Sequence, residues 1–249
     1  NEKINWMKFY TDTSKWTELA DKYRVRAYVE SKGLADILVP LYGVWEKPED
    51  IDFSSLPKSF VLKTNHACGT VILVEDKNQL NIQEAIDKLR LWMEMKIGIE
   101  TVEYHYLQIT PLIMAEKMLA SADEIVDYKL FTINGNVELI LVCSDRTIGV
   151  GCKLSLYDAD WNFIPEKLSG VHLKDNVERL PKPKSFERMK ECARILSEGF
   201  PQVRVDFYDI NGKLYFGELT FTSQGGYMNY IAPEELLRLG KKIVLPKSI

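Results

Sequence analysis

Two apolar, β-rich runs near the C-terminal end of the chain each contain an acidic residue, and this pattern constrains the fold most. The stretch from Val203 to Thr220 carries Asp206 in its first run and Glu218 in its second, with an Asn-Gly pair between the runs. Such a pair between β-rich runs predicts a hairpin. A carboxylate buried in a strand is unfavourable unless a partner compensates its charge, and a divalent metal is a common partner. With Arg204 two residues before the first acid, the stretch indicates a metal–phosphate site.

The register of this hairpin decides whether the two acids can act together. Side chains alternate between the two faces of a strand. A regular two-residue loop places Asp206 and Glu218 on opposite faces. A three-residue loop or a bulge places them on one face, together with Arg204 and Thr220. The metal site therefore requires an odd-length loop or a bulge, and a hairpin with solvent-facing acids is the alternative.

Composition narrows the class of protein. The 249 residues include 32 Lys and Arg against 36 Asp and Glu, without a basic block, so the sequence does not predict nucleic-acid binding. The longest apolar run, residues 137–143, contains a glutamate and is far shorter than the roughly 20 residues of a membrane-spanning helix. Scattered cysteines and histidines argue against a zinc site and favour free thiols in the cytoplasm. The chain opens on Asn-Glu-Lys without an apolar signal region, and the missing Met leaves open a trimmed leader.

Local patterns predict an α+β fold with mostly antiparallel strands. Before the hairpin, strands are expected at residues 59–63, 70–74, 128–134, 137–143 and 150–157, and residues 112–119 are expected to form a strand that runs into a linker. Helices are expected at residues 21–29, after a capping Asn81, between a capping Ser185 and Gly199, and from Pro233 onward.

Three polar residues in or beside these strands are candidates for ligand binding. Lys63 ends an apolar strand and opens a loop that Gly69 closes, and such a strand–loop–strand can offer backbone N–H groups to phosphates. A lysine whose stem merely covers apolar surface is the alternative. The alternation around Lys129 does not decide whether its side chain points inward. Glu116 follows an apolar run at the junction between the two β regions, where it could accept the exocyclic amine of an adenine; an ordinary loop acid is the alternative.

Several motifs occur in order along nearly the whole chain. They cover residues 21–26 (DKYRVR), 60–66 (FVLKTNH) with Gly69, 127–131 (DYKLF), 157–161 (YDADW), 204–208 (RVDFY) and 216–221 (FGELTF). The set resembles the ATP-grasp fold, and within it the ATP-grasp family named for teichuronopeptide biosynthesis.

The resemblance implies two α+β subdomains with mainly antiparallel sheets that grip ATP between them. Residues 1–57 would form a reduced N-terminal substrate-side segment, residues 58–115 the lid subdomain, and residues 116–249 the core subdomain with the metal site. The resemblance also implies which residues would bind the nucleotide, the metal and the transferred phosphoryl group. Lys63 and Lys129 would bind the nucleotide and act in catalysis with Arg204, which would stabilise the transferred phosphoryl group. The rest of the ATP site would consist of Asn65, His66, Gly69, Glu116, Lys117 and Met118. The ligands of Mg²⁺ would be Asp206, Glu218 and Thr220.

The sequence departs from the family pattern at two places. The loop after His66 is Ala67-Cys68-Gly69, where the family tends toward Gly-Ser-Gly, which implies a stiffer loop over the phosphates. Many ATP-grasp enzymes have Glu-x-Asn at the second metal position, whereas this chain has Thr220 two residues after Glu218. A hydroxyl is a poorer metal ligand than an amide carbonyl, and Asn229 is the alternative ligand.

By resemblance, the expected activity is that of an ATP- and Mg²⁺-dependent ligase working in the cytoplasm. It would form an amide through an acyl phosphate, joining an amino acid or amine to a carboxylated sugar of a surface polysaccharide. Arg24, Arg26 and Arg146 are candidate clamps for substrate carboxylates. A phosphotransferase acting on a hydroxyl and a non-catalytic nucleotide- or glycan-binding module remain alternatives. A glycosyltransferase, suggested only by the short Asp-x-Asp pattern from Asp158, ranks below them.

Overall fold

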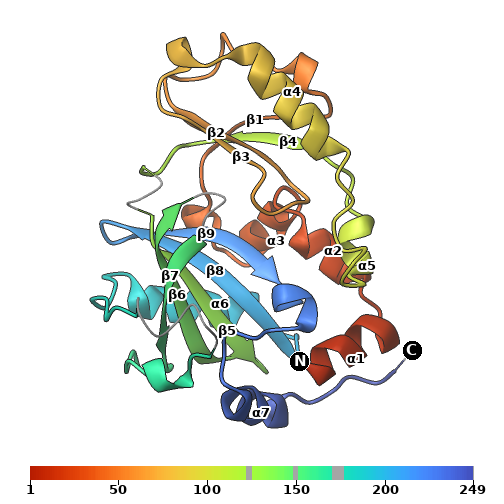
Figure 1. Cartoon of the computed structure of the whole chain (residues 1–249), viewed down its shortest axis with the longest axis vertical. Coiled ribbons are helices and arrows are strands. Elements are labelled where there is room, and N and C mark those ends of the chain that lie inside the picture. The colour runs from red at the N-terminus through yellow and green to blue at the C-terminus, as the bar shows by residue number, and fades with distance from the viewer. Residues whose placement is uncertain (122–124, 148–150, 170–176, 249) are drawn as a thin grey trace.

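Two antiparallel sheets make up the framework of the molecule (Figure 1). The computed structural model describes residues 1–121, 125–147, 151–169 and 177–248, with the backbone alone for residues 146 and 147. The smaller sheet lies above the larger one in Figure 1, and helices α2 and α3 lie beside the region between them. This arrangement confirms the expected α+β class with antiparallel sheets.

The smaller sheet has four strands in the order β1-β4-β2-β3. Its strands are β1 (Leu41–Trp45), β2 (Phe60–Thr64), β3 (Val71–Val74) and β4 (Ile113–Glu116). Helix α4 (Ile82–Met93) packs on it through the fully buried Leu89, which shares a cluster with Phe60 and Leu62. The Asn81 side chain accepts the backbone N–H of Glu84 at 3.2 Å, so the predicted cap is present.

The larger sheet has five strands in the order β7-β6-β5-β8-β9. They are β5 (Asp127–Ile133), β6 (Asn136–Thr147), β7 (Gly151–Tyr157), β8 (Gln202–Ile210) and β9 (Lys213–Thr220). Helix α6 (Phe186–Leu196) buries its predicted stripe of Met189, Cys192, Ala193 and Leu196 against this sheet. The N-terminal helices share the same hydrophobic cluster; they are α1 (Glu2–Tyr10), α2 (Ser14–Ala20) and α3 (Val25–Ser31). Short α5 (Tyr104–Leu107) and the last helix, α7 (Pro233–Lys242), complete the α-helices of the described residues.

The N-terminal segment contributes to both sheets. Strand β1 pairs with β4 in the smaller sheet, whereas helices α1 to α3 pack with the larger sheet. The subdomain boundaries at residues 57 and 115 stay predictions. In the described residues, no helix combines the length and apolar character needed to cross a membrane.

Two local predictions differ from the structure. The helix expected at residues 21–29 begins only at Val25, because Asp21 forms a turn in which its Oδ1 accepts the backbone N–H groups of Tyr23 and Arg24. The Ser185 side chain makes no capping hydrogen bond to α6 and donates instead to Asp209 at 2.5 Å. At Asp21 the side chain forms a local turn in place of the first helical residues, and at Ser185 the hydroxyl bonds a residue of β8 in place of the helix N-terminus.

The β8–β9 hairpin combines a two-residue loop with a bulge. Ile210 pairs with Lys213, so the loop consists of Asn211 and Gly212, both with positive φ as a tight hairpin turn requires. The register then shifts, because Asp206 pairs with Glu218 while Phe207 pairs with Phe216. Gly217 is the extra residue, and it returns both acids to one face of the sheet. Of the two geometries that a shared face allows, the structure therefore contains the bulge and not the odd-length loop.

Candidate functional site

Arg204 forms the centre of a buried cluster of charges on the larger sheet. Its Nε donates to Asp206 Oδ1 and its Nη2 to Asp206 Oδ2, each at 2.7 Å. The same Nη2 lies 3.0 Å from Glu218 Oε1 and from Thr220 Oγ1. These contacts follow from the register, because Arg204 pairs with Thr220 and Asp206 pairs with Glu218. The predicted shared face thus brings all four side chains together.

Lys129 joins this cluster from the neighbouring strand β5. It pairs with Asp206 in the β5–β8 ladder, and its Nζ lies 2.6 Å from Asp206 Oδ2 and 2.5 Å from Asp127 Oδ2. Burial opposes its charge, but the two carboxylates raise the pKa of Lys129 above its usual value. The orientation that the sequence left open is therefore toward the acids.

The two acids of the cluster, Asp206 and Glu218, differ in their exposure to solvent. Asp206 is 1% exposed, and burial raises its carboxyl pKa while Arg204 and Lys129 act in the opposite direction. The Glu218 side chain is 31% exposed. Burial alone would raise its pKa, but Lys22, Arg204 and Lys129 outweigh this effect and lower the pKa of Glu218 to about 2. Glu218 is therefore an ionised carboxylate at neutral pH that solvent can reach.

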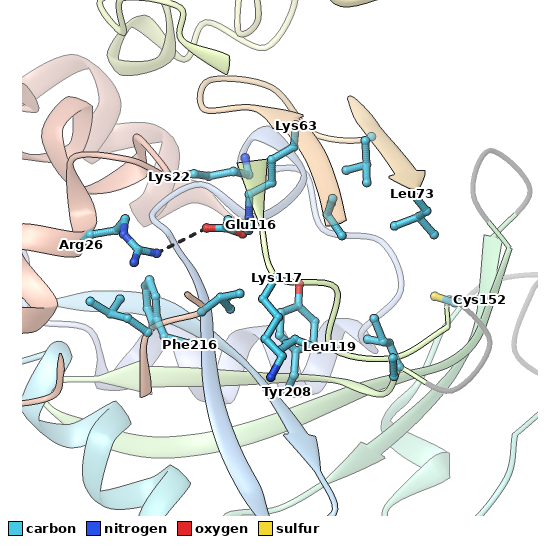
Figure 2. A pocket seen from close by; sticks show the side chains of 18 of the residues that line it. Lys22, Arg26, Lys63, Leu73, Glu116, Lys117, Leu119, Cys152, Tyr208 and Phe216 are labelled. Atoms are coloured by element: carbon cyan, nitrogen blue, oxygen red, sulfur yellow. Dashed lines mark hydrogen bonds and ion pairs between the residues drawn. The ribbon is translucent and has the colours of Figure 1, made fainter. Parts of the chain in front are cut away.

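A cavity of about 480 Å³ lies between the two sheets (Figure 2). The cluster adjoins it through Gly217, the neighbour of Glu218, which lines the cavity. Both sheets line it: β2, β3 and β4 from the smaller sheet, and β7, β8 and β9 from the larger one. Its apolar wall includes Val39, Val61, Leu73, Leu119, Ile125 and Phe216. Lys22, Arg26, Lys63 and Lys117 give it a basic character that Glu116 partly offsets. An apolar wall with a few cations suits a ligand that carries both a flat apolar group and negative charge.

Glu116 is bound by two cations from different parts of the chain. Lys63 Nζ on β2 lies 2.5 Å from Glu116 Oε2, and Arg26 Nη1 on α3 lies 3.4 Å from Oε1. Figure 2 shows Lys22, Lys63 and Arg26 grouped around Glu116, with Cys152 on the other side of the cavity. Arg26 thereby connects the helices of the larger sheet to the end of β4 in the smaller sheet.

The loop after β2 holds its predicted residues in distinct ways. The Asn65 side chain is fully buried, donates to the Thr110 carbonyl at 3.0 Å and accepts the Leu112 N–H at 2.7 Å. His66 is buried, and this burial lowers its pKa. Gly69 adopts a positive φ of 74° and lines the cavity. Of these residues, Gly69 is therefore the one placed on the cavity wall, while the Asn65 amide anchors the loop to the segment before β4.

The remaining predicted residues are spread more widely. Lys117 lines the cavity, whereas Met118 is half-buried next to it in sequence. Arg24 is half-exposed and lies 3.7 Å from Asp21. Arg146 belongs to β6, but its side chain lies outside the described residues. Asn229 is exposed, and its backbone N–H donates to Gln224.

The oxygens of Asp206 and Glu218 fit a hard cation such as Mg²⁺. A carboxylate oxygen can accept two bonds. Asp206 Oδ1 takes one from Arg204, and Glu218 Oε2 faces Lys22 at 3.7 Å, so both oxygens retain acceptor capacity. In the described parts of the chain, no group of three or more His, Cys, Asp or Glu side chains could hold a metal by itself. Mg²⁺ is commonly bound by one or two carboxylates together with substrate phosphates.

Two residues of the site escaped the sequence analysis. Lys22 lines the cavity from the turn before α3, and Gly217 forms the bulge between the acids. A glycine inside an otherwise regular strand pattern is a known sign of a bulge, so Gly217 carried a usable signal. Lys22 lay within the motif at residues 21–26, but no role was assigned to it, because a lysine inside a predicted helix is ordinary.

Comparison with solved structures identifies the fold. The L-amino acid ligase from Bacillus licheniformis matches with a TM-score of 0.53 and 16% identity, over 86% of this chain and 45% of the ligase. The D-alanine–D-alanine ligase from Bacillus anthracis matches with a TM-score of 0.53 and 16% identity, over 94% of this chain and 68% of that one. The chain thus spans less than half the length of the first of these proteins. Together with the two sheets around the cavity, these similarities define an ATP-grasp fold.

The family follows from the sequence comparison. The TupA-like ATP-grasp family matches residues 2–244, so the chain belongs to this family. No curated protein matches the chain. The resemblance found from the ordered motifs is thereby confirmed.

Proposed function

We propose that the chain is an ATP-dependent ligase that joins a carboxylate to an amine. The observation that carries this proposal is the Arg204–Asp206–Glu218–Lys129 cluster beside a cavity between two sheets. The cavity suits a nucleotide: its apolar wall can contact a base, and Lys63 and Lys22 can approach phosphates. The family and the fold, which occurs in two amino acid ligases, support the same assignment.

The proposed reaction transfers a phosphoryl group and then an acyl group. A carboxylate oxygen attacks the γ-phosphorus of ATP, the bond to the bridging oxygen breaks, and ADP leaves. An amine nitrogen then attacks the acyl carbon and the bond between that carbon and the phosphate oxygen breaks. Phosphate leaves with the oxygen and the electron pair of that bond, and the amine loses a proton. Such catalysis depends mainly on positioning and on compensating negative charge.

Each residue of the cluster has a proposed part in this reaction. Lys63 and Lys129 bind phosphate oxygens of the nucleotide, and Arg204 stabilises the transferred phosphoryl group. Asp206, Glu218 and Thr220 would hold Mg²⁺ with the phosphates, and Thr220 also donates a 3.1 Å hydrogen bond to Glu218. When bound, Mg²⁺ would neutralise negative charge on the phosphate oxygens. We propose that Glu116 and its neighbours Lys117 and Met118 line the adenine site.

The substrate class rests on the family alone. We propose a carboxylated sugar of a surface polysaccharide as the acyl donor and an amino acid or other amine as the nucleophile. Of the two predicted carboxylate clamps whose side chains the structure describes, Arg26 lines the cavity and Arg24 does not, although Glu116 already binds Arg26. We also propose a cytoplasmic location, because ATP is available there and none of the four cysteines forms a disulfide in the described structure.

Isotope transfer tests the reaction class. The protein is incubated with Mg-ATP, glucuronic acid labelled with ¹⁸O in its carboxylate, and a panel of common amino acids. A ligase transfers one ¹⁸O atom into the released phosphate and forms an amide, and Glu218→Gln abolishes both. In the absence of an amine, hydroxylamine should trap the acyl phosphate as a hydroxamate.

Two other results would assign a different function. A stable phosphorylated sugar, formed without an amine and without released phosphate, would indicate a phosphotransferase. Failure of Mg-ATP to bind in a calorimetric titration would leave a non-catalytic module. Lys88→Gln serves as the matched control, because Lys88 is exposed on α4 and pairs only with Glu84 among its described contacts.

A further inference from the structure

We propose that Ser223 is a positioning residue that sets the orientation of the Arg204 guanidinium group for phosphoryl transfer, and that Glu103 fixes the turn that carries Ser223. This inference rests on the proposed function and extends it to two residues that are not among those lining the cavity. Ser223 follows strand β9 and is 4% exposed. Glu103 immediately precedes helix α5 and is 8% exposed.

The described contacts of Arg204 leave one hydrogen-bond donor for a ligand, and it lies on Nη1. An arginine side chain has five N–H donors, one on Nε and two on each terminal nitrogen. Nε donates to Asp206, and Nη2 is engaged by Asp206, Glu218 and Thr220. Among the contacts of the described residues, Nη1 donates to the Ser223 hydroxyl, at 3.3 Å. The second N–H of Nη1 is therefore the donor available to a phosphoryl oxygen.

The contact with Ser223 controls the direction of this donor. A guanidinium group is planar, so contacts at two of its edges fix the direction of all its N–H bonds. The acids hold the edge formed by Nε and Nη2, and Ser223 holds Nη1. A hydrogen bond weakens steeply when its donor angle falls below about 120°. Rotation of the group after loss of Ser223 would therefore weaken the contact with a phosphoryl oxygen.

The turn that carries Ser223 is held at both ends. The Gly225 N–H donates to the Thr222 carbonyl at 2.8 Å, which closes the turn around Ser223. At one end, the Thr222 hydroxyl donates to the Glu103 carboxylate. At the other end, Lys8 Nζ on α1 donates to the Gly225 carbonyl at 2.7 Å. All of these residues are buried, so water does not compete for the contacts that hold the turn.

Glu103 connects this turn to the rest of a buried polar network. Its Oε1 accepts the Thr222 hydroxyl and its Oε2 accepts the Thr101 hydroxyl. The Thr101 carbonyl in turn accepts Lys8 Nζ at 2.6 Å. Hydrogen bonds to a carboxylate are roughly twice as strong as those between neutral groups. Loss of the Glu103 carboxylate would therefore release Thr222 and, with it, the neighbouring Ser223.

A purely structural role for this network makes a different prediction. If the turn only stabilised the fold, Ser223→Ala would lower the free energy of unfolding and leave both the reaction rate and Arg204 unchanged. If Ser223 positions Arg204, the reaction slows while Mg-ATP still binds, because Ser223 is not among the residues that line the cavity. The comparison of rate and binding in one variant therefore separates the two roles.

The first test measures hydroxamate formation with Mg-ATP, glucuronic acid and hydroxylamine, and the dissociation constant of Mg-ATP by calorimetry. Ser223→Ala should react about 10- to 100-fold more slowly, the usual effect of losing a hydrogen bond to a charged group, with a change in dissociation constant of less than about threefold. Ser197→Ala is the matched control and should react at the unmodified rate. Ser197 is also fully buried, its hydroxyl bonds the Arg194 carbonyl at 3.2 Å, and it is not among the cavity-lining residues.

A double variant tests whether Glu103 acts through Ser223. Glu103→Gln keeps the shape of the side chain but removes its charge, which weakens its hydrogen bonds and should slow the reaction about 3- to 10-fold. Combined with Ser223→Ala, it should add no further slowing, because effects that follow one route are not additive. Multiplied effects would show that Glu103 acts independently of Ser223 and would overturn its proposed role.

A spectroscopic measurement reports on Arg204 directly and needs no substrate. In protein labelled with ¹⁵N in arginine, a held guanidinium group gives separate Nη1 and Nη2 signals, and Arg204→Lys identifies those of Arg204. Ser223→Ala should speed the exchange between them several-fold, and Ser197→Ala should not. Merged Arg204 signals in the unmodified protein, or an unchanged exchange or reaction rate in Ser223→Ala, overturn this inference and leave the proposed function intact. An unmodified protein that forms no hydroxamate overturns both.

Discussion

Asp206 and Glu218 are direct partners across the β8–β9 ladder, and they share one face because Gly217 adds a residue to β9. A regular two-residue hairpin would separate them. Arg204 can therefore bind both carboxylates with one guanidinium group. The site depends on this single inserted residue more than on the loop that closes the hairpin.

Substitution of Gly217 by alanine should damage the bulge. A Cβ atom there would lie 3.0 Å from the backbone oxygen of Asp206, closer than ordinary contact allows. We expect a loss of about 1–3 kcal/mol in the free energy of unfolding, typical of overpacking, together with weaker Mg-ATP binding. Urea denaturation and calorimetry measure the two effects. Gly240→Ala is the control: no atom lies within 4 Å of its Cβ position in helix α7, so it should be neutral or stabilising.

Removal of the guanidinium group at Arg204 should be strongly destabilising. Asp206 and Glu218 would lose a shared buried cation, and breaking a buried ion pair from one side costs about 3–5 kcal/mol. Arg204→Met should lower the free energy of unfolding by about this amount in urea denaturation. In the double variant with Asp206→Asn the loss should be smaller than the sum of the two single losses, because the contact is shared. Additive losses would show that Arg204 and Asp206 are not coupled.

Glu116 should determine the preference for adenine, if the proposed nucleotide site is correct. Its carboxylate binds Lys63 and Arg26 in the structure and is proposed to accept the exocyclic amine of the base. The unmodified protein should bind ATP more tightly than ITP, in which an oxygen replaces that amine. Glu116→Gln should bring the two dissociation constants closer together. A ratio unchanged by the substitution would remove Glu116 from the base site.

Stability should fall as the pH is lowered from about 6.5 to about 4, partly through His105. This side chain is 2% exposed and packs edge-on against Trp16. Burial, and then Lys8, lowers its pKa from 6.5 to about 4. In this pH window the unfolded chain binds a proton that the folded protein excludes, so the free energy of unfolding rises with pH, by at most about 3 kcal/mol.

The His105→Gln variant tests this contribution. Denaturation midpoints measured between pH 4 and pH 7 should depend less steeply on pH in the variant than in the unmodified protein. Lys88→Gln should keep the original slope. An unchanged slope in His105→Gln would assign the pH dependence to other groups.

Much of the framework could be predicted because its signals are local. The Asn81 cap, the buried stripe of α6 and the start of the last helix at Pro233 each depend on residues within one or two turns. Runs of apolar residues similarly predicted the strands of both sheets except β1 (Leu41–Trp45), for which no strand was expected. At Ser185, local propensity predicted a capping hydrogen bond that does not form, because the hydroxyl bonds Asp209, 24 residues away in the sequence.

The sequence by itself determined which chemical groups the hairpin carries: two acids and an arginine within apolar strands, and the order of motifs that marks the family. Only the tertiary structure decided that these groups meet. Asp206 and Glu218 share a face because of the bulge at Gly217, and the sequence was compatible with a hairpin with or without that bulge. Tertiary structure also decided that Lys129 points toward Asp206 and that Lys22, from a distant turn, lies 3.7 Å from Glu218. Charges separated along the chain come together through packing of whole elements, and that packing is not encoded in any short window of sequence.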